Sequence, residues 1–406
     1  MKKKDKKKPK YSMLSDMGFM LKAAWRSSPV YFPMAAIIIV TLTLIPAIAM
    51  VLPSRVIALL EQGASFERIT LEIGLMSLGL LLCAAAGQGL YSYTDFRHLT
   101  SPRLRLGCDA VLKIASTDYP HGERQDFLNV SEKRLEVMND NNSALEESFR
   151  MMQRLSTAFI GLVIYAAVLW SMSPWVLLMV AALTSVGFIA RLRANNWTFK
   201  NRDNWTPFER KLQYIMTESG NYKFAKDVRL FGMSEWLCDL YDSCSRARKD
   251  WGKKQSWVEF FADAVGCLIT FLREGAAYAW LIYGAVTGSV DPAAFVLYFS
   301  AVGNFSEQLM SCLKEFSDLH RAHLKIAVFR ELLDWPDEFR HEGGRPIPGG
   351  GWELTLEHVS YRYPGAEKDT IHDMCLTLRS GEKAALVGLN GAGKSTRVKP
   401  LCGLYD

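Results

Sequence analysis

Apolar residues in this chain gather in long blocks separated by charged stretches. Val30–Pro53 and Leu155–Ala190 contain no charged side chain. The second block is interrupted at Pro174, and Trp170 and Trp175 stand on either side, as aromatic residues do near a membrane surface. About 20 apolar residues are enough to cross a bilayer as a helix. We therefore predict one membrane span in the first block and two, joined by a tight turn, in the second.

Three further apolar segments complete the predicted membrane part. Each is shorter or less purely apolar than the two blocks above, but each is long enough to cross a bilayer. They are Ile69–Leu90, which carries only Glu72 as a charged residue, Trp257–Val286 and Pro292–Met310. The sequence thus predicts six membrane spans.

Two charged segments of about sixty residues, Tyr91–Arg150 and Arg191–Lys254, separate these spans. They are much longer than a membrane hairpin needs, and apolar residues recur in them at helical spacing. We expect the flanking spans to continue as helices beyond the membrane. A further helix over Phe305–Trp335 is expected to do the same and to end before Pro336, because proline cannot continue a helix.

The chain changes character after that helix. Asp337–Gly351 contains two prolines and five glycines, which is typical of a linker. Short apolar runs follow, so the pattern predicts a second domain that is soluble. Its expected strands are Trp352–Val359, Met374–Leu378 and Ala384–Val387.

The distribution of basic residues predicts the orientation in the membrane. Nine of the first 29 residues are Lys or Arg, whereas the loop between the first two spans has only Arg55 and Arg68 as basic residues. Loops rich in Lys and Arg stay on the cytoplasmic side. We predict a multi-pass protein of the plasma membrane whose N-terminus, long charged segments and C-terminus are cytoplasmic.

Composition excludes some other functions. The formal net charge of +6 derives mainly from the Lys-rich start of the chain, so nucleic-acid binding is not indicated. The eight cysteines form no C-x-x-C motif and are expected to be reduced. No spacing of His, Cys and carboxylate residues in the sequence indicates a metal site.

A complete phosphate-binding motif, G-x-x-x-x-G-K-[ST], lies within residues 388–396. Its glycines let backbone N–H groups point at phosphate oxygens, and the N-terminus of the helix that follows adds its positive end. Lys394 is expected to reach the β- and γ-phosphates, and the Ser395 hydroxyl to bind Mg²⁺. The motif therefore predicts ATP and Mg²⁺ as ligands of Gly388, Asn390, Gly391, Ala392, Gly393, Lys394, Ser395 and Thr396.

A second feature lies at a fixed distance from this motif. The segment Val359–Gly365 reads V-S-Y-R-Y-P-G, and Tyr363 lies 25 residues before Gly388. Together with six spans, two long charged segments and a linker, these motifs resemble an ATP-binding cassette (ABC) exporter of the half-transporter type. The resemblance implies that Tyr363 stacks on adenine. It also implies that Lys226–Gly232 belongs to the second cytoplasmic loop, near a helix that couples the two domains.

The resemblance implies a fold and an activity. The fold is a mostly α-helical membrane protein: a six-helix ABC exporter domain with long cytoplasmic helical loops, followed by the incomplete start of an α/β P-loop nucleotide-binding domain. The activity is ATP-driven export across a lipid membrane by a homodimer, or by a heterodimer with another half-transporter. The expected domains are a basic tail at 1–29, the transmembrane domain at 30–335, a linker at 336–351 and the nucleotide-binding fragment at 352–406.

Several motifs of that family are not in these 406 residues: the glutamine loop, the L-S-G-G-Q signature, the Walker B aspartate with the catalytic glutamate, and the switch histidine. Phosphoryl transfer needs groups that position water and Mg²⁺ as well as a phosphate cradle. We therefore expect a chain truncated after the phosphate loop that does not hydrolyse ATP alone. One alternative is a non-hydrolysing membrane domain or regulatory partner. Another is a P-loop kinase or GTPase with a membrane anchor, which the Tyr363 spacing and the six spans disfavour.

Arg273 and Glu274 fall inside the fifth predicted span. Charged residues within membrane spans are costly and mark functional sites by default, which indicates a polar transport cavity. A structural role with partners on neighbouring helices is equally compatible with the sequence. Because adjacent residues point to different faces of a helix, we expect these two side chains not to pair simply with each other.

Overall fold

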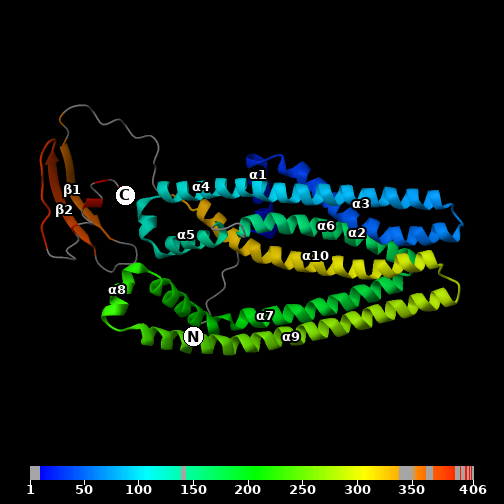
Figure 1. The fold of residues 1–406 in the computed structure, drawn as a ribbon. Helices are drawn as coiled ribbons and strands as arrows, with labels where there is room; N and C mark the ends of the chain where they lie inside the picture. The colour runs from blue at the N-terminus through cyan, green and yellow to red at the C-terminus, as the bar shows by residue number, and fades with distance from the viewer. Residues whose placement is uncertain are drawn as a thin grey trace. The chain divides into compact units, whose positions relative to one another are not determined.

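The computed structural model describes residues 10–138, 143–337, 351, 353–362 and 369–388, and positions 394, 398, 399, 402 and 404. Long helices are followed by two strands (Figure 1). In chain order the elements are α1 Met13–Ser27, α2 Tyr31–Glu61, α3 Phe66–Thr94, the π-helical turn η1 Asp95–Leu99, α4 Thr100–Ser116, the 3₁₀ turn η2 Tyr119–Glu123, α5 Gln125–Met138, α6 Ala144–Met172, α7 Pro174–Ser219, α8 Tyr222–Leu230, α9 Ser234–Val286, α10 Pro292–Leu333, β1 Glu353–Tyr361 and β2 Ile371–Arg379.

In the described part of the chain, five helices are long and apolar enough to cross a membrane, and they contain the first five predicted spans. The predicted turn is confirmed, because α6 ends at Met172 and α7 begins at Pro174. The expected extension is confirmed as well: α7 has 46 residues and α9 has 53, against the roughly 20 that a bilayer requires. The five helices are Tyr31–Glu61, Phe66–Ser116, which runs through α3, η1 and α4, Ala144–Met172, Pro174–Ser219 and Ser234–Val286.

The sixth predicted span, Pro292–Met310, lies in α10, which is not among these five helices of the described chain. Polar residues such as Glu307 and Gln308 dilute its apolar run. The Gln308 side chain packs where Gly161 has no Cβ, since a Cβ added there would lie 3.2 Å from it. Ala301 is fully buried. A helix shielded by its neighbours tolerates polar residues that a lipid-facing helix does not.

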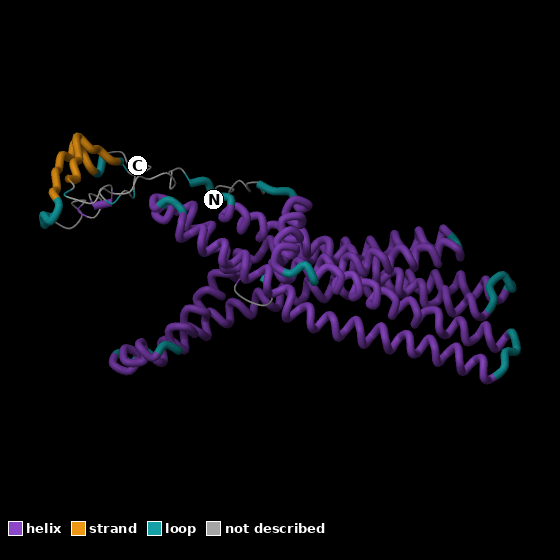
Figure 2. The backbone as a smooth tube through the Cα atoms, turned by 90° about the horizontal axis from the view of Figure 1, so that it is seen from above, coloured by secondary structure: helices purple, strands orange, loops and turns teal. Residues whose placement is uncertain are grey.

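Residues 30–96 and 149–319 form one compact unit. Its helices α7 and α9 run side by side, and α8 joins their ends (Figure 2). Apolar side chains from α2, α6, α7, α9 and α10 meet in its core, while many others on these helices remain exposed. The core residues are Met50, Tyr165, Leu169, Val176, Val180, Ala277, Ala301, Val302 and Phe305.

The other compact unit contains residues 1–29, 97–148 and 320–406. Charged side chains hold α1 against α10 within it. The Asp16 carboxylate, 1% exposed, is hydrogen-bonded to His323 Nδ1 at 2.7 Å and accepts from Arg330 at 3.3 Å. Tyr11 Oη donates to Asp334 at 2.6 Å, and burial followed by this hydrogen bond raises the pKa of Tyr11 to about 12.

Strands β1 and β2 form an antiparallel pair, which confirms two of the three predicted strands. The third expectation, a strand at Ala384–Val387, is wrong: these residues are described and have no regular secondary structure. The physical reason is that a buried strand of this kind needs hydrogen-bonding neighbours. Within the described ranges, no strand lies beside this segment.

Candidate nucleotide-binding loop and membrane cavity

A tight turn after β2 leads toward the predicted phosphate loop. Gly381 has a φ of +84°, a conformation in which glycine carries no Cβ penalty. The backbone N–H of Glu382 donates to the Arg379 carbonyl at 2.9 Å, and the Glu382 carboxylate accepts from the Arg379 N–H at 3.0 Å. These two bonds close the turn and direct the chain toward Gly388.

Two predicted nucleotide-binding residues, Gly388 and Lys394, lie in the described part of the chain. Lys394 is helical, as are Val398 and Lys399, which agrees with a helix after the loop. Its Nζ donates to the Gly388 carbonyl oxygen at 2.6 Å, so the ammonium group lies against the backbone of the loop. The other predicted residues, Tyr363, Asn390, Gly391, Ala392, Gly393, Ser395 and Thr396, lie outside the described residues.

Arg273 is buried, with 7% of its surface exposed. Its Nη1 donates to Thr184 Oγ1 on α7 at 3.3 Å, and its Nη2 donates to Glu274 Oε1 at 2.9 Å. The expectation that the two adjacent charged residues do not pair is therefore wrong. The arginine side chain is long and flexible enough for its guanidinium to reach the neighbouring carboxylate although their Cβ atoms diverge.

The Arg273 guanidinium borders a cavity of about 640 Å³ among α7, α9 and α10. Its wall combines apolar groups with both charge signs. Arg191 and Asp263, 3.6 Å apart, form a second ion pair on this wall, and both side chains are mostly exposed. Arg273 Nε has no hydrogen-bond partner among the described residues. Such a cavity suits a ligand that has both apolar and polar groups, because the apolar side chains of its lining supply contact area and the polar ones supply donors and acceptors.

Helix α8 joins α7 to α9 and has no buried residue. Its first turn is capped by the Asn221 side chain, which accepts from the Lys223 N–H at 3.1 Å. Tyr222 is 92% exposed and Leu230 is 70% exposed. Large exposed apolar side chains on a helix mark a surface that another element can cover. The helix includes most of the segment Lys226–Gly232, which the resemblance to ABC exporters places in the second cytoplasmic loop, near a coupling helix.

A second polar cluster joins the segment after α10 to the α4–η2 connection, and no motif in the sequence predicts it. Asp337 accepts from Lys113 Nζ at 2.5 Å and from Thr117 Oγ1 at 2.7 Å. Burial alone would raise the pKa of the Asp337 carboxyl. The two hydrogen bonds, the positive charge of Lys113 and a backbone hydrogen bond from Asp118 together outweigh burial and hold that pKa below its usual range. His121 and Asp118 complete the group and are both buried. More than 200 residues separate Asp337 from its partners in sequence, so no local pattern could predict the contact.

Comparison with known proteins bears on both parts of the chain. The sequence profile of the ABC transporter family matches residues 371–406, which include the phosphate loop. The subtilin transport ATP-binding protein of Bacillus subtilis is 24% identical over 277 residues, which make up 62% of this chain and 41% of that protein.

Two ATP-dependent lipid A-core flippases are similar over a shorter region. That of Sodalis glossinidius is 26% identical and that of Salmonella typhi 27% identical, each over 185 residues. These residues make up 45% of this chain and 31% of each flippase. The chain thus spans less than half the length of the relatives it matches.

Proposed function

We propose that this chain, which belongs to the ABC transporter family, provides the membrane domain and the first part of the ATP-binding cassette of an ATP-driven exporter. It is an integral membrane protein. One observation carries the proposal: five apolar helices and a segment that matches the ABC family are joined in one chain. The relatives named for subtilin transport and for lipid A-core flipping support this activity class.

ATP and Mg²⁺ are the proposed ligands of the phosphate loop. Tyr363 would stack on adenine, and the backbone from Gly388 to Gly393 would surround the phosphates. Lys394 already lies against this loop through its bond to the Gly388 carbonyl. Ser395 would donate its hydroxyl oxygen to Mg²⁺, and Thr396 would contact phosphate beside it.

We assign the transport path to the cavity that contains Arg273 and Glu274. Intramembrane charges are costly to retain, and these two stand in a cavity rather than in a fully packed core. The pair also has a donor, Arg273 Nε, without a partner in the described structure. A transported molecule with a polar group could therefore form a hydrogen bond that the protein itself does not make.

The partner is proposed to be a second half-transporter, either a copy of this chain or a related one. Much of the apolar surface of the spans is exposed in the single chain; the most apolar part of the α3–α4 span, for example, has no buried residue. Lipid can cover such a surface, but the exposed α8 lies next to helix segments that are too long to remain inside a bilayer. We propose that α8 contacts an ATP-binding cassette. We also propose that the chain lies in the plasma membrane with both termini in the cytoplasm.

Photolabelling tests the nucleotide site directly. The purified 406-residue chain in detergent is irradiated with 8-azido-ATP and Mg²⁺, with Lys394→Ala as the variant and Lys383→Ala as the matched control. We expect labelling that excess ATP suppresses, that Lys394→Ala loses and that Lys383→Ala retains. Equal labelling of all three proteins would contradict the assignment of the phosphate loop.

Transport is tested in inverted membrane vesicles that contain the chain together with the rest of its cassette. ATP-dependent uptake should stop with Lys394→Ala. If uptake is unchanged, the chain is not the ATP-driven component, and the non-hydrolysing role described above becomes the better interpretation.

A further inference from the structure

Two groups of side chains in the described structure have ligand atoms close enough to share a metal ion. In the first, Asp337 already binds the Lys113 ammonium and the Thr117 hydroxyl, so protein groups occupy its oxygens. The second consists of His358, Asp373 and Cys375 on the two strands, and no ammonium or guanidinium group is bonded to it in the described structure. It lies away from the phosphate loop in sequence and has no part in the function proposed above.

The second group is created by two irregularities of the β1–β2 pairing. The register shifts on both sides of the Val359↔Met374 pair. On one side of this pair, β1 has one residue more than the facing segment of β2, which contains Cys375. On the other side, β2 has one residue more than the facing segment of β1. A β-bulge of this kind redirects side chains locally. His358 and Asp373, one in each bulge, have φ values of +51° and +50°.

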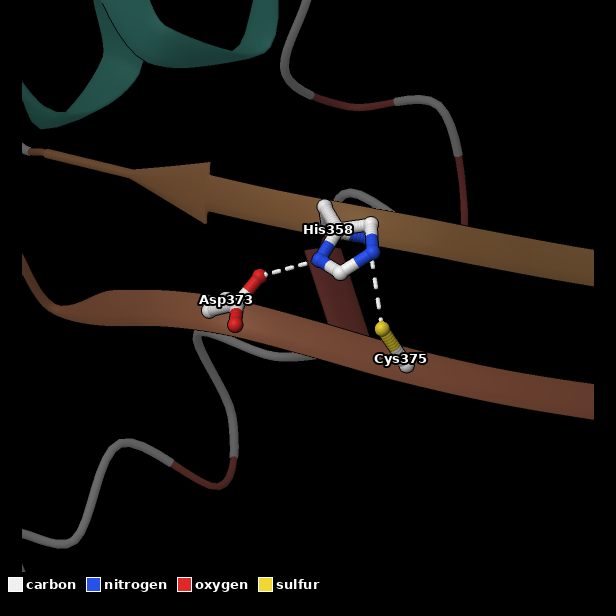
Figure 3. A group of neighbouring side chains, drawn as sticks. All are labelled: His358, Asp373 and Cys375. Atoms are coloured by element: carbon white, nitrogen blue, oxygen red, sulfur yellow. Dashed lines mark hydrogen bonds and ion pairs between the residues drawn. The ribbon is translucent and has the colours of Figure 1, made fainter.

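The two bulges bring the side chains of these residues together. His358 Nδ1 lies 2.5 Å from Asp373 Oδ1, and the His358 backbone N–H donates to Cys375 Sγ at 3.4 Å. Figure 3 shows the carboxyl group and the sulfur on β2 facing the imidazole from β1. One nitrogen, one oxygen and one sulfur atom of the group all lie within 4.8 Å of one another. The His358 and Asp373 side chains are 78% and 56% exposed, so an ion can reach them.

The donor types select a class of metal ion. Imidazole nitrogen and thiolate sulfur suit Zn²⁺ and similar transition-metal ions, whereas Mg²⁺ and Ca²⁺ require oxygen ligands. Bonds of about 2.0 to 2.3 Å to a tetrahedral ion place its ligand atoms roughly 3 to 4 Å apart. The observed separations, from 2.5 Å between nitrogen and oxygen up to at most 4.8 Å, span this range, and the exposure of the group leaves the fourth position open to water.

We propose that His358, Asp373 and Cys375 bind a zinc-type ion on the strand pair. The ion takes the place of the proton between His358 Nδ1 and Asp373 Oδ1, and that proton moves through water to Nε2 of the same ring. The Cys375 thiol releases its proton to the solvent as the sulfur–metal bond forms. The site lies outside the phosphate loop and does not depend on nucleotide. It ties β1 to β2 at the point where both bulges interrupt the backbone ladder.

Cobalt titration of the full 406-residue chain tests this proposal. The protein is treated with a chelator in reducing detergent solution, and Co²⁺ is added until one equivalent is bound. We expect a thiolate-to-cobalt absorption band and strong visible bands of a tetrahedral ion, which Zn²⁺ then displaces. Absence of the thiolate band after one equivalent would overturn the proposal.

Substitutions assign the ligands. Cys375→Ser should remove the thiolate band, and His358→Asn and Asp373→Asn should each weaken Zn²⁺ binding by at least about tenfold. Asparagine is chosen because it tolerates positive φ. The matched controls are Cys402→Ser and His372→Asn, which change an exposed residue of the same type outside the group. A thiolate band that survives Cys375→Ser but disappears with Cys402→Ser would reassign the sulfur ligand and contradict the site.

A variant-free measurement guards against loss of folding in the substituted proteins. One equivalent of Zn²⁺ should slow alkylation of Cys375 by N-ethylmaleimide at least about tenfold, while Cys402, which is also exposed, reacts at an unchanged rate. Mass spectrometry of the two peptides gives both rates in the same sample. Equal rates for Cys375 with and without Zn²⁺ would reject the proposal regardless of how the variants behave.

Discussion

Two buried charged side chains, one in each compact unit, differ in how completely they are paired. Both carboxylate oxygens of Asp16 have cationic or imidazole partners, at 2.7 Å from His323 and 3.3 Å from Arg330. Arg273 is nearly as buried, yet it binds only Thr184 and Glu274, and its Nε has no partner in the described structure. The Asp16 carboxylate holds α1 against α10, whereas the Arg273 guanidinium borders a cavity.

This difference separates structural from functional charge. A buried charge that is fully hydrogen-bonded holds two elements together, and removal of one partner leaves the others uncompensated. A buried charge with an unused donor near a cavity can bind something else without losing its own partners. We therefore expect substitution of Asp16 to affect mainly folding, and substitution of Arg273 to affect mainly binding.

Asp16→Asn should have the largest effect on stability. The amide keeps the shape of the side chain but removes the charge that compensates His323 and Arg330, so the free energy of unfolding should fall by about 3 kcal/mol. Thermal unfolding in detergent, followed by intrinsic fluorescence, measures the change in Tm. Asp109→Asn, at an exposed position on α4, is the control and should leave Tm unaltered. If both variants unfold at the Tm of the wild type, the Asp16 contact does not hold α1 in place.

Arg273→Gln should change the free energy of unfolding by only about 1 kcal/mol, because the amide can still bond Thr184 and the Glu274 side chain is one-third exposed. Under the proposed function it should nevertheless abolish ATP-dependent uptake in vesicles. Arg191→Gln alters the same cavity at a side chain that is 68% exposed, and it should leave most uptake intact. If Arg273→Gln instead lowered the folded fraction while each folded molecule transported normally, Arg273 would be a structural charge and not a binding group.

The sequence predicted the helices better than their contacts. The apolar blocks and Pro174 mark the first five spans because both signals are local, and α6 and α7 end and begin where the proline requires. The sixth predicted span differs, because α10 carries polar residues such as Gln308, which packs against Gly161, beside core residues such as Ala301. Composition alone does not report which neighbours shield a helix.

The sites illustrate the same limit. The phosphate motif is contiguous, so it could be read directly, although only Gly388 and Lys394 lie in the described structure. The pairing of Arg273 with Glu274 depends on side-chain conformation, which helix periodicity does not specify. The His358, Asp373 and Cys375 group depends on two bulges, and its residues have no metal-binding spacing in the sequence.

Asp337 gives an intermediate case with a pH dependence. The pKa of Asp337 is lower in the folded protein than in the unfolded chain, where it is about 4. The ionised carboxyl therefore stabilises the fold above about pH 4, and this stabilisation is lost as the pH falls through the pKa of the folded state. Asp337→Asn should therefore lower the free energy of unfolding by about 1 kcal/mol at neutral pH, with a smaller difference from wild type in acid. Tm measured from pH 7 to pH 3 tests this, with Asp239→Asn as an exposed control. If the stability difference between Asp337→Asn and the wild type instead grew as the pH fell, the ionised carboxylate would not be the form that stabilises the fold.

The smallest effect is expected for a charged pair that is not buried. Lys253 Nζ lies 3.8 Å from Asp250 Oδ1 on α9, and the two side chains are 77% and 72% exposed. Water already solvates both groups, and ordering two long side chains costs entropy, so Lys253→Ala should change the free energy of unfolding by less than about 0.5 kcal/mol. Thermal unfolding at low and high salt measures this directly, because a pair that matters would be weakened by screening. If Lys253→Ala destabilised the chain as strongly as Asp16→Asn, then completeness of pairing in a buried site would not be what distinguishes a structural charge in this protein.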